Sequence, residues 1–123
     1  MEKTPVLLVD DEPDFLEAAR LSLESGGYTV ITAPDAESAL EIARIREISM
    51  AVVDVNLPGM DGFELCRALR RSHPGQDLPV LFLSVRQEMR DMVQGIASGA
   101  LDYLTKPIGR LELVAAVKRA LAA

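Results

Sequence analysis

The feature of the sequence that most constrains its fold is an alternation of short apolar runs with segments of helical periodicity. The clearest run, Met50–Val53, ends at Asp54 and precedes a loop that contains Pro58, Gly59 and Gly62. A β-branched-rich run of four or five apolar residues, closed by turn residues, is typical of a strand buried on both faces. We therefore expect Asp54 where a buried strand emerges into a loop, although a carboxylate in a turn can also serve only to cap backbone groups.

The same alternation extends along the whole chain. The predicted strands are Val6–Val9, Tyr28–Thr32, Met50–Asp54, Pro79–Leu83 and Leu101–Leu104. The predicted helices begin at Pro13, Ala36, Phe63, Met89 and Arg110 and end near Ser25, Ile45, Ser72, Ala97 and Ala122, and the last has Leu111, Val114, Val117 and Leu121 on one face. Strands joined through helices run parallel, which predicts an α/β fold with five helices covering both faces of a five-stranded parallel sheet.

Length and composition point to one domain over residues 1–123. The net charge of −6 and the lack of a basic cluster argue against direct binding to nucleic acid. A single cysteine, Cys66, excludes an internal disulfide, and its helical spacing favours a core residue over a reactive thiol. No apolar stretch approaches the roughly 20 residues of a membrane span, and no signal-peptide pattern begins the chain, so we expect a cytoplasmic protein.

Polar side chains follow four of the predicted strands. Asp10 and Asp11 follow the first strand, Asp54 ends the third, Ser84 ends the fourth and Lys106 follows the fifth. In an open parallel sheet, ligands bind beyond the carboxyl ends of the strands. We therefore expect these five side chains to gather at one edge of the sheet.

Three carboxylates gathered in this way require a cation. Two unit charges about 4 Å apart repel by roughly 4 kcal/mol at an effective dielectric near 20. Hard oxygen ligands without nearby His or Cys favour Mg²⁺, with Mn²⁺ as the alternative, over zinc. With Lys106 and Ser84 beside it, such a site could stabilise a phosphoryl group in transfer, and a carboxylate can itself be the nucleophile that forms an acyl phosphate.

Four sequence blocks carry a resemblance to a known family. They are VLLVDDEP (6–13), VVDVNLPGMDG (52–62), VLFLS (80–84) and DYLTKP (102–107). In order and spacing they resemble the receiver domain of two-component response regulators. The resemblance implies a flavodoxin-like, doubly wound sheet with strand order 2-1-3-4-5.

The resemblance also implies roles for the acidic residues. Asp54 corresponds to the phosphoacceptor and Asp11 to the direct metal ligand, while Asp10 would act through water and Asn56 through its backbone carbonyl. The implied donor is a sensor histidine kinase or a phosphotransfer protein. The output domain or target protein stays open, and a phosphorylation-dependent homodimer is a further expectation.

Three more residues correspond to parts of the family's switch. Ser84 matches the hydroxyl that turns toward the phosphoryl group, and Lys106 matches its ion-pairing partner, with a cis bond to Pro107. Tyr103 matches the aromatic residue that rotates inward when the hydroxyl moves. The surface implied to change is the one formed by the fourth helix, the fifth strand and the fifth helix.

Val85 departs from the family pattern, in which the residue after the switch hydroxyl is commonly small. We expect its bulk to slow loss of the phosphoryl group, with Asn56 and Arg86 also tuning access. Two other function classes stay open at this point. One is a binding module that works without phosphorylation, against which the intact acidic residues and Lys106 argue. The other is an aspartyl phosphatase, whose usual second carboxylate is replaced here by Asn56.

Overall fold

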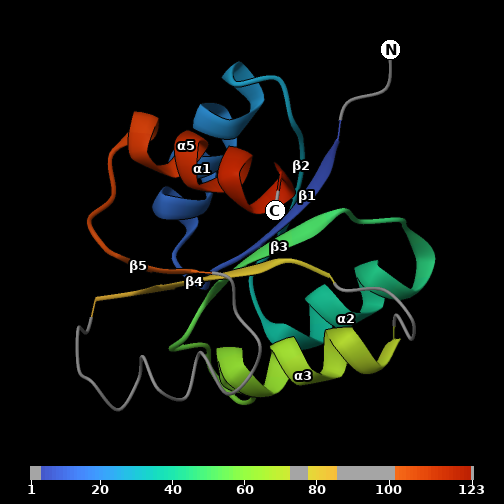
Figure 1. The fold of residues 1–123 in the computed structure, drawn as a ribbon. Coiled ribbons are helices and arrows are strands. Elements are labelled where there is room, and N and C mark those ends of the chain that lie inside the picture. Colours follow the sequence, from blue (N-terminus) through green and yellow to red (C-terminus); the bar gives the residue numbers. More distant parts are fainter. Residues whose placement is uncertain (1–3, 73–77, 86–101, 123) are drawn as a thin grey trace.

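The computed structural model describes residues 4–72, 78–85 and 102–122, which form a five-stranded sheet in the order β2-β1-β3-β4-β5 (Figure 1). The strands are β1 (Pro5–Val9), β2 (Thr29–Ala33), β3 (Met50–Asp54), β4 (Val80–Ser84) and β5 (Asp102–Thr105). The described helices are α1 (Pro13–Ser25), α2 (Ala36–Ile45), α3 (Gly62–Ser72) and α5 (Arg110–Ala122). Every pair of neighbouring strands is parallel, so the predicted fold class and strand order are confirmed.

Within the described residues, the predicted and observed elements agree to within one or two residues. The second strand, for example, is Thr29–Ala33 and not Tyr28–Thr32. Pro13 stands in the first turn of α1 as expected, and Gly27 follows the helix with a φ of 99°, a conformation that glycine adopts without strain. The predicted helix Met89–Ala97 and the access residue Arg86 lie outside the described residues.

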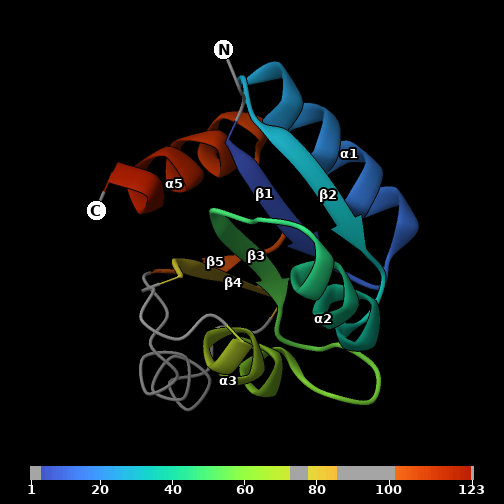
Figure 2. The same ribbon diagram turned by 90° about the vertical axis from the view of Figure 1, so that its right-hand side faces the viewer.

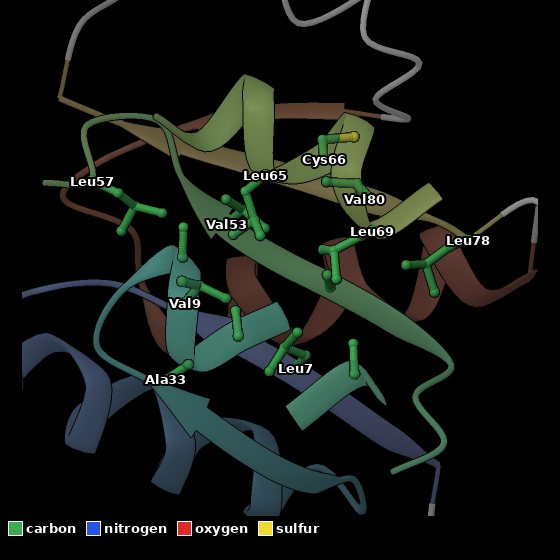
Figure 3. Packing of buried hydrophobic residues seen from close by; sticks show 14 of the residues in the cluster. Leu7, Val9, Ala33, Val53, Leu57, Leu65, Cys66, Leu69, Leu78 and Val80 are labelled. Atoms are coloured by element: carbon green, nitrogen blue, oxygen red, sulfur yellow. The ribbon is translucent and has the colours of Figure 1, made fainter. Parts of the chain in front are cut away.

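The described helices cover the two faces of the sheet in pairs. Figures 1 and 2 show α1 and α5 on one face, with α2 and α3 on the other. Side chains along β1 alternate between the two sides, because successive residues of a strand point to opposite faces. Val6 and Leu8 pack toward α1 and α5, whereas Leu7 and Val9 pack toward α2 and α3. The close-up in Figure 3 shows the second of these cores, in which Cys66 is a fully buried packing residue.

The central strand is buried from end to end. All five residues of β3 are buried, including Asp54 at its carboxyl end. A strand flanked by two others and covered on both faces reads as a continuous apolar run, which explains why this segment was the clearest in the sequence. Asp54 therefore stands at the end of a strand that is paired on both sides and covered on both faces.

The prediction of which residues form the apolar face of α5 is wrong in part. Leu111 is 79% exposed, whereas the predicted Val117 is fully buried. The buried residues Leu113, Ala116, Val117 and Ala120 follow an i, i+3, i+4, i+7 pattern. Leu111 precedes Leu113 by two residues, which is about 200° around a helix of 3.6 residues per turn, and so it lies on the opposite side.

Candidate functional site

The site lies at the edge where the carboxyl ends of β1, β3, β4 and β5 meet. The sheet register aligns Val9 with Val53 and Asp54 with Leu83, so the end of β3 lies between the ends of β1 and β4. Ser84 is aligned in turn with Thr105, the residue before Lys106. Residues far apart in the sequence reach one edge because the strands are parallel and in close register.

Three carboxylates meet at this edge. One carboxylate oxygen from each of Asp10, Asp11 and Asp54 lies within 4.8 Å of the other two. Asp10 is fully buried and Asp54 is 5% exposed, while Asp11 is exposed. The predicted convergence of the acidic residues is therefore confirmed, and Asp11 gives the cluster an open side.

Backbone amides orient the two buried carboxylates. The N–H of Glu12 donates to Oδ1 of Asp10 at 2.9 Å, and the N–H of Asn56 donates to Oδ1 of Asp54 at 3.1 Å. Each bond comes from the residue two positions later, in the loop that follows the strand. Each carboxylate thus keeps its second oxygen, Oδ2, for a partner across the site.

Lys106 supplies that partner. Its Nζ atom lies 2.5 Å from Oδ2 of Asp10 and 3.7 Å from Oδ2 of Asp54. The backbone N–H of Lys106 donates to the carbonyl oxygen of Ser84 at 2.8 Å, which ties the loop after β5 to the end of β4. The Lys106-Pro107 bond is cis, as the resemblance implied. The Lys106 ammonium therefore pairs with both the Asp10 and the Asp54 carboxylates, and it lies nearer Asp10.

The environment disfavours the charged form of Asp54. Burial raises the pKa of the Asp54 carboxyl above its ordinary value, and the charges of Asp10 and Asp11 act in the same direction. The hydrogen bond from Asn56 and the charge of Lys106 oppose this rise without cancelling it. The cluster thus carries more negative charge than its one ammonium offsets.

The donor set fits a hard divalent cation. Mg²⁺ and Mn²⁺ favour carboxylate and carbonyl oxygens, and Mg²⁺ binds proteins through one or two carboxylates while keeping several waters. The three clustered carboxylates meet that requirement, and the exposure of Asp11 leaves room for water. Among the described residues, these three form the only such acidic, His or Cys cluster.

The remaining predicted residues lie at or beside this edge. Ser84 is fully buried at the end of β4, and Asn56 is exposed in the loop after β3. Tyr103 lies on the edge strand β5, aligned with Phe82 of β4, and is half-buried against the core on the α2 and α3 side. Tyr103 is therefore a packing residue of that core in this conformation, and not a member of the charged cluster.

Two residues of the site were missed from the sequence. The ring centroid of Phe15, in the first turn of α1, lies 4.2 Å from Nζ of Lys106. A Cβ atom on Gly62 would lie 2.4 Å from the carbonyl oxygen of Asp54, so only glycine lets α3 begin against the end of β3. The Gly62 N–H donates to the Val55 carbonyl at 3.0 Å. The neighbouring residues in the sequence indicate neither contact, except that Gly62 belongs to a predicted turn.

Comparison with known proteins agrees with this geometry. The family model described as "Response regulator receiver domain" matches residues 6–118. The chain is 41% identical over 120 residues to the transcriptional regulatory protein CseB of Streptomyces avermitilis, covering 98% of this chain and 50% of that protein. It is 42% identical over 113 residues to the alkaline phosphatase synthesis transcriptional regulatory protein PhoP of Bacillus subtilis, covering 92% of this chain and 46% of that protein.

A solved structure gives the same result. The chemotaxis protein CheY4 of Vibrio cholerae superposes with a TM-score of 0.92 at 31% identity, covering 97% of this chain and 99% of that one. The chain spans about half the length of the curated relatives it matches. Across the described ranges, no helix combines the length and apolar character that crossing a membrane requires.

Proposed function

This chain belongs to the response regulator receiver family, whose members are signalling phosphoacceptors and not turnover enzymes, and we propose that it accepts a phosphoryl group on Asp54 from a sensor histidine kinase or a phosphotransfer protein. The observation that carries the proposal is the meeting of Asp10, Asp11 and Asp54 around one buried strand end with Lys106 alongside. A carboxylate held in this way is rigid, short of positive charge and open to a ligand on one side.

The chemistry is a phosphoryl transfer between two nucleophiles. A carboxylate oxygen of Asp54 attacks the phosphorus of a phosphohistidine, a C–O–P linkage forms, and the P–N bond breaks with its electron pair leaving on the imidazole. We assign Oδ2 of Asp54 as the nucleophile, because Oδ1 accepts the backbone N–H of Asn56. We assign Lys106 to pair with a phosphoryl oxygen, and the 3.7 Å distance from its Nζ to that Oδ2 supports the assignment.

We assign the metal site to Mg²⁺, or to Mn²⁺ in its place. Asp11 and Asp54 would hold the ion together with the backbone carbonyl of Asn56, and Asp10 would act through water. When bound, the ion supplies positive charge that offsets the clustered carboxylates and the phosphoryl oxygens. Burial raises the pKa of Asp54, and a bound cation would favour the carboxylate form that attacks.

We propose that Ser84 and Tyr103 carry the change outward. Phosphorylation adds negative charge and strong acceptor oxygens at the end of β3. The buried hydroxyl of Ser84 turns toward them, and the half-buried ring of Tyr103 follows into the vacated space. The surface so altered includes β5 and α5, together with the predicted fourth helix, which lies outside the described residues.

Intact mass spectrometry tests the proposal directly. Incubation with acetyl phosphate and Mg²⁺ should add one phosphoryl group, and the adduct should be lost in Asp54→Asn, without Mg²⁺, or after hydroxylamine, which cleaves acyl phosphates. Asp61→Asn is the matched control, because Asp61 lies in the loop that follows Asp54 and its Oδ1 accepts the backbone N–H of Glu64 in α3. Turnover of unrelated phosphate esters would favour a phosphatase, and a wild-type chain that forms no adduct would favour a binding module.

The same proposal also names the classes of partner. The donor is a histidine kinase or phosphotransfer protein, and the consumer of the signal is an output domain or a target protein. We also propose that phosphorylation promotes a homodimer, and that the 1–123 region acts as one receiver unit in the cytoplasm. The net charge of −6 favours protein partners over direct contact with nucleic acid.

A further inference from the structure

The ammonium of Lys106 has an aromatic neighbour in addition to its two carboxylates. The ring centroid of Phe15 lies 4.2 Å from Nζ, against 2.5 Å to Oδ2 of Asp10 and 3.7 Å to Oδ2 of Asp54. Phe15 stands in the first turn of α1, and Asp10 lies three residues before that helix begins at Pro13. The ring and the Asp10 carboxylate thus hold Lys106 from the same end of β1.

We propose that Phe15 is a positioning residue that holds the Lys106 ammonium against Asp10 and thereby opposes binding of the divalent cation. The inference rests on the metal site described above and deepens it. It assigns a function to a contact that the transfer chemistry itself does not require.

The first step of the argument is the attraction between ring and ammonium. A cation over an aromatic face is attracted by the ring's quadrupole, more strongly when it is withdrawn from water. The side chain of Lys106 is only 13% exposed, so this attraction is poorly screened. A leucine in the place of Phe15 would fill much of the same space without attracting the charge.

The second step is the competition for Asp10. An ammonium 2.5 Å from the fully buried Asp10 carboxylate already offsets part of the cluster's negative charge. A divalent ion bound by the neighbouring Asp11 and Asp54 would be repelled by that ammonium, because like charges a few ångströms apart in a partly buried site interact strongly. Whatever stabilises Lys106 in its present position therefore weakens the metal site.

Titration calorimetry of the metal-free chain with Mg²⁺ tests this coupling. Phe15→Leu should lower the Kd for Mg²⁺ by about two- to tenfold, the range of an exposed to partly buried cation–π contact. Phe15→Tyr keeps the ring and should keep the Kd of the wild-type chain. An unchanged or higher Kd in Phe15→Leu would overturn the inference.

A double-mutant cycle separates the electrostatic effect from packing. In a Lys106→Met background no ammonium is present, so adding Phe15→Leu should leave the Kd unchanged; an equal decrease in both backgrounds would overturn the inference. Leu16→Ala is the packing control, since Leu16 is half-buried in the same core and lies next to Phe15 in α1. It should lower thermal stability without changing the Kd.

A measurement on the wild-type chain needs no variant at all. Protons on the Lys106 methylene next to Nζ should resonate upfield of ordinary lysine values in the metal-free protein, because they lie near the Phe15 ring, and should move back when Mg²⁺ is added. Ordinary shifts in the metal-free state would overturn the inference. If the wild-type chain binds no Mg²⁺ at all, the proposed function itself fails, which is a different outcome from binding that is insensitive to Phe15.

Discussion

A Cβ atom at Gly62 would lie 2.4 Å from the carbonyl oxygen of Asp54. The first residue of α3 therefore packs directly on the backbone of the residue that we assign as phosphoacceptor. Gly62 also donates its N–H to the carbonyl of Val55, at 3.0 Å. The start of α3 and the end of β3 are thus held together, and the position of Asp54 depends on residue 62 being a glycine, which has no side chain.

Gly62→Ala should destabilise the protein and reduce labelling of Asp54. The added methyl group would clash with backbone atoms, which cannot move away by changing rotamer as a side chain can. Overpacking of this kind lowers the free energy of unfolding by about 1–3 kcal/mol. Urea unfolding gives the free energy, and the acetyl phosphate assay gives the labelling. Gly109→Ala is the control, because a Cβ atom there has no neighbour within 4 Å; equal effects at both positions would contradict the interpretation.

Asp54→Asn should make the metal-free protein more stable at neutral pH. Burial raises the pKa of Asp54, so the folded chain binds this proton more tightly than the unfolded chain does. The stability that the group contributes is then full below its unfolded pKa, about 3.9, and is lost as the pH rises through the raised value. Urea unfolding in EDTA, measured from acid to neutral pH, gives the free energy of unfolding of both chains. The extra stability of Asp54→Asn over the wild-type chain should shrink as the pH falls.

Asp35→Asn provides a comparison of opposite sign. The N–H of Ser38 donates to Oδ1 of Asp35 at 2.7 Å and lowers the pKa of that carboxyl. Asp35 therefore contributes stability above its unfolded pKa, which is lost as the pH falls through the lowered value. Its replacement should destabilise the protein at neutral pH, and a gain in stability there would contradict the sign assigned to Asp35.

Mg²⁺ should stabilise the wild-type chain through the acidic cluster. A ligand that binds only the folded state at 100 times its Kd raises the free energy of unfolding by about 2.7 kcal/mol. Thermal unfolding with and without Mg²⁺ measures the shift, which EDTA should reverse. Asp11→Asn should reduce it strongly, whereas Asp14→Asn, an exposed change in the first turn of α1, should retain it. An equal shift in both variants would place the ion elsewhere.

Val85→Ala should shorten the lifetime of the phosphorylated state. Val85 follows the buried Ser84 and is 68% exposed. We expect its side chain to hinder the approach of a donor or a water molecule to Asp54. A smaller residue should speed loss of the phosphoryl group severalfold, equivalent to a barrier change on the order of 1 kcal/mol. The decay of the mass adduct gives the rate, and an unchanged rate would show that Val85 does not control access.

Cys66 should be inert in the folded protein. Burial raises the pKa of the Cys66 thiol, and the residue packs in the core between the sheet and α3, so both thiolate formation and reagent access are suppressed. A thiol reagent such as DTNB should react only at the rate of unfolding, and at once in urea. Rapid reaction under native conditions would show that this core opens locally.

Much of the fold and of the site could be predicted from local patterns. The apolar runs ending at Asp54 and Ser84 mark strands, because a strand covered on both faces must be apolar throughout. Parallel strands joined by helices then bring their carboxyl ends to one edge, which places Asp10 and Asp54 together without any coordinates. The strand order came from the family resemblance, since the alternation alone is compatible with several orders.

What only the tertiary structure decided is how those side chains are paired. Asp10 and Lys106 are 96 positions apart, and no local pattern records that the ammonium lies nearer Asp10 than Asp54 or that the Phe15 ring lies against it. The exposure of Leu111 depends in the same way on where α5 meets the sheet. Periodicity in a sequence reports which face of each element is apolar, whereas distances between elements are set by packing. The residue types and their edge of the sheet were therefore determined by the sequence itself, and the contacts among them by the fold.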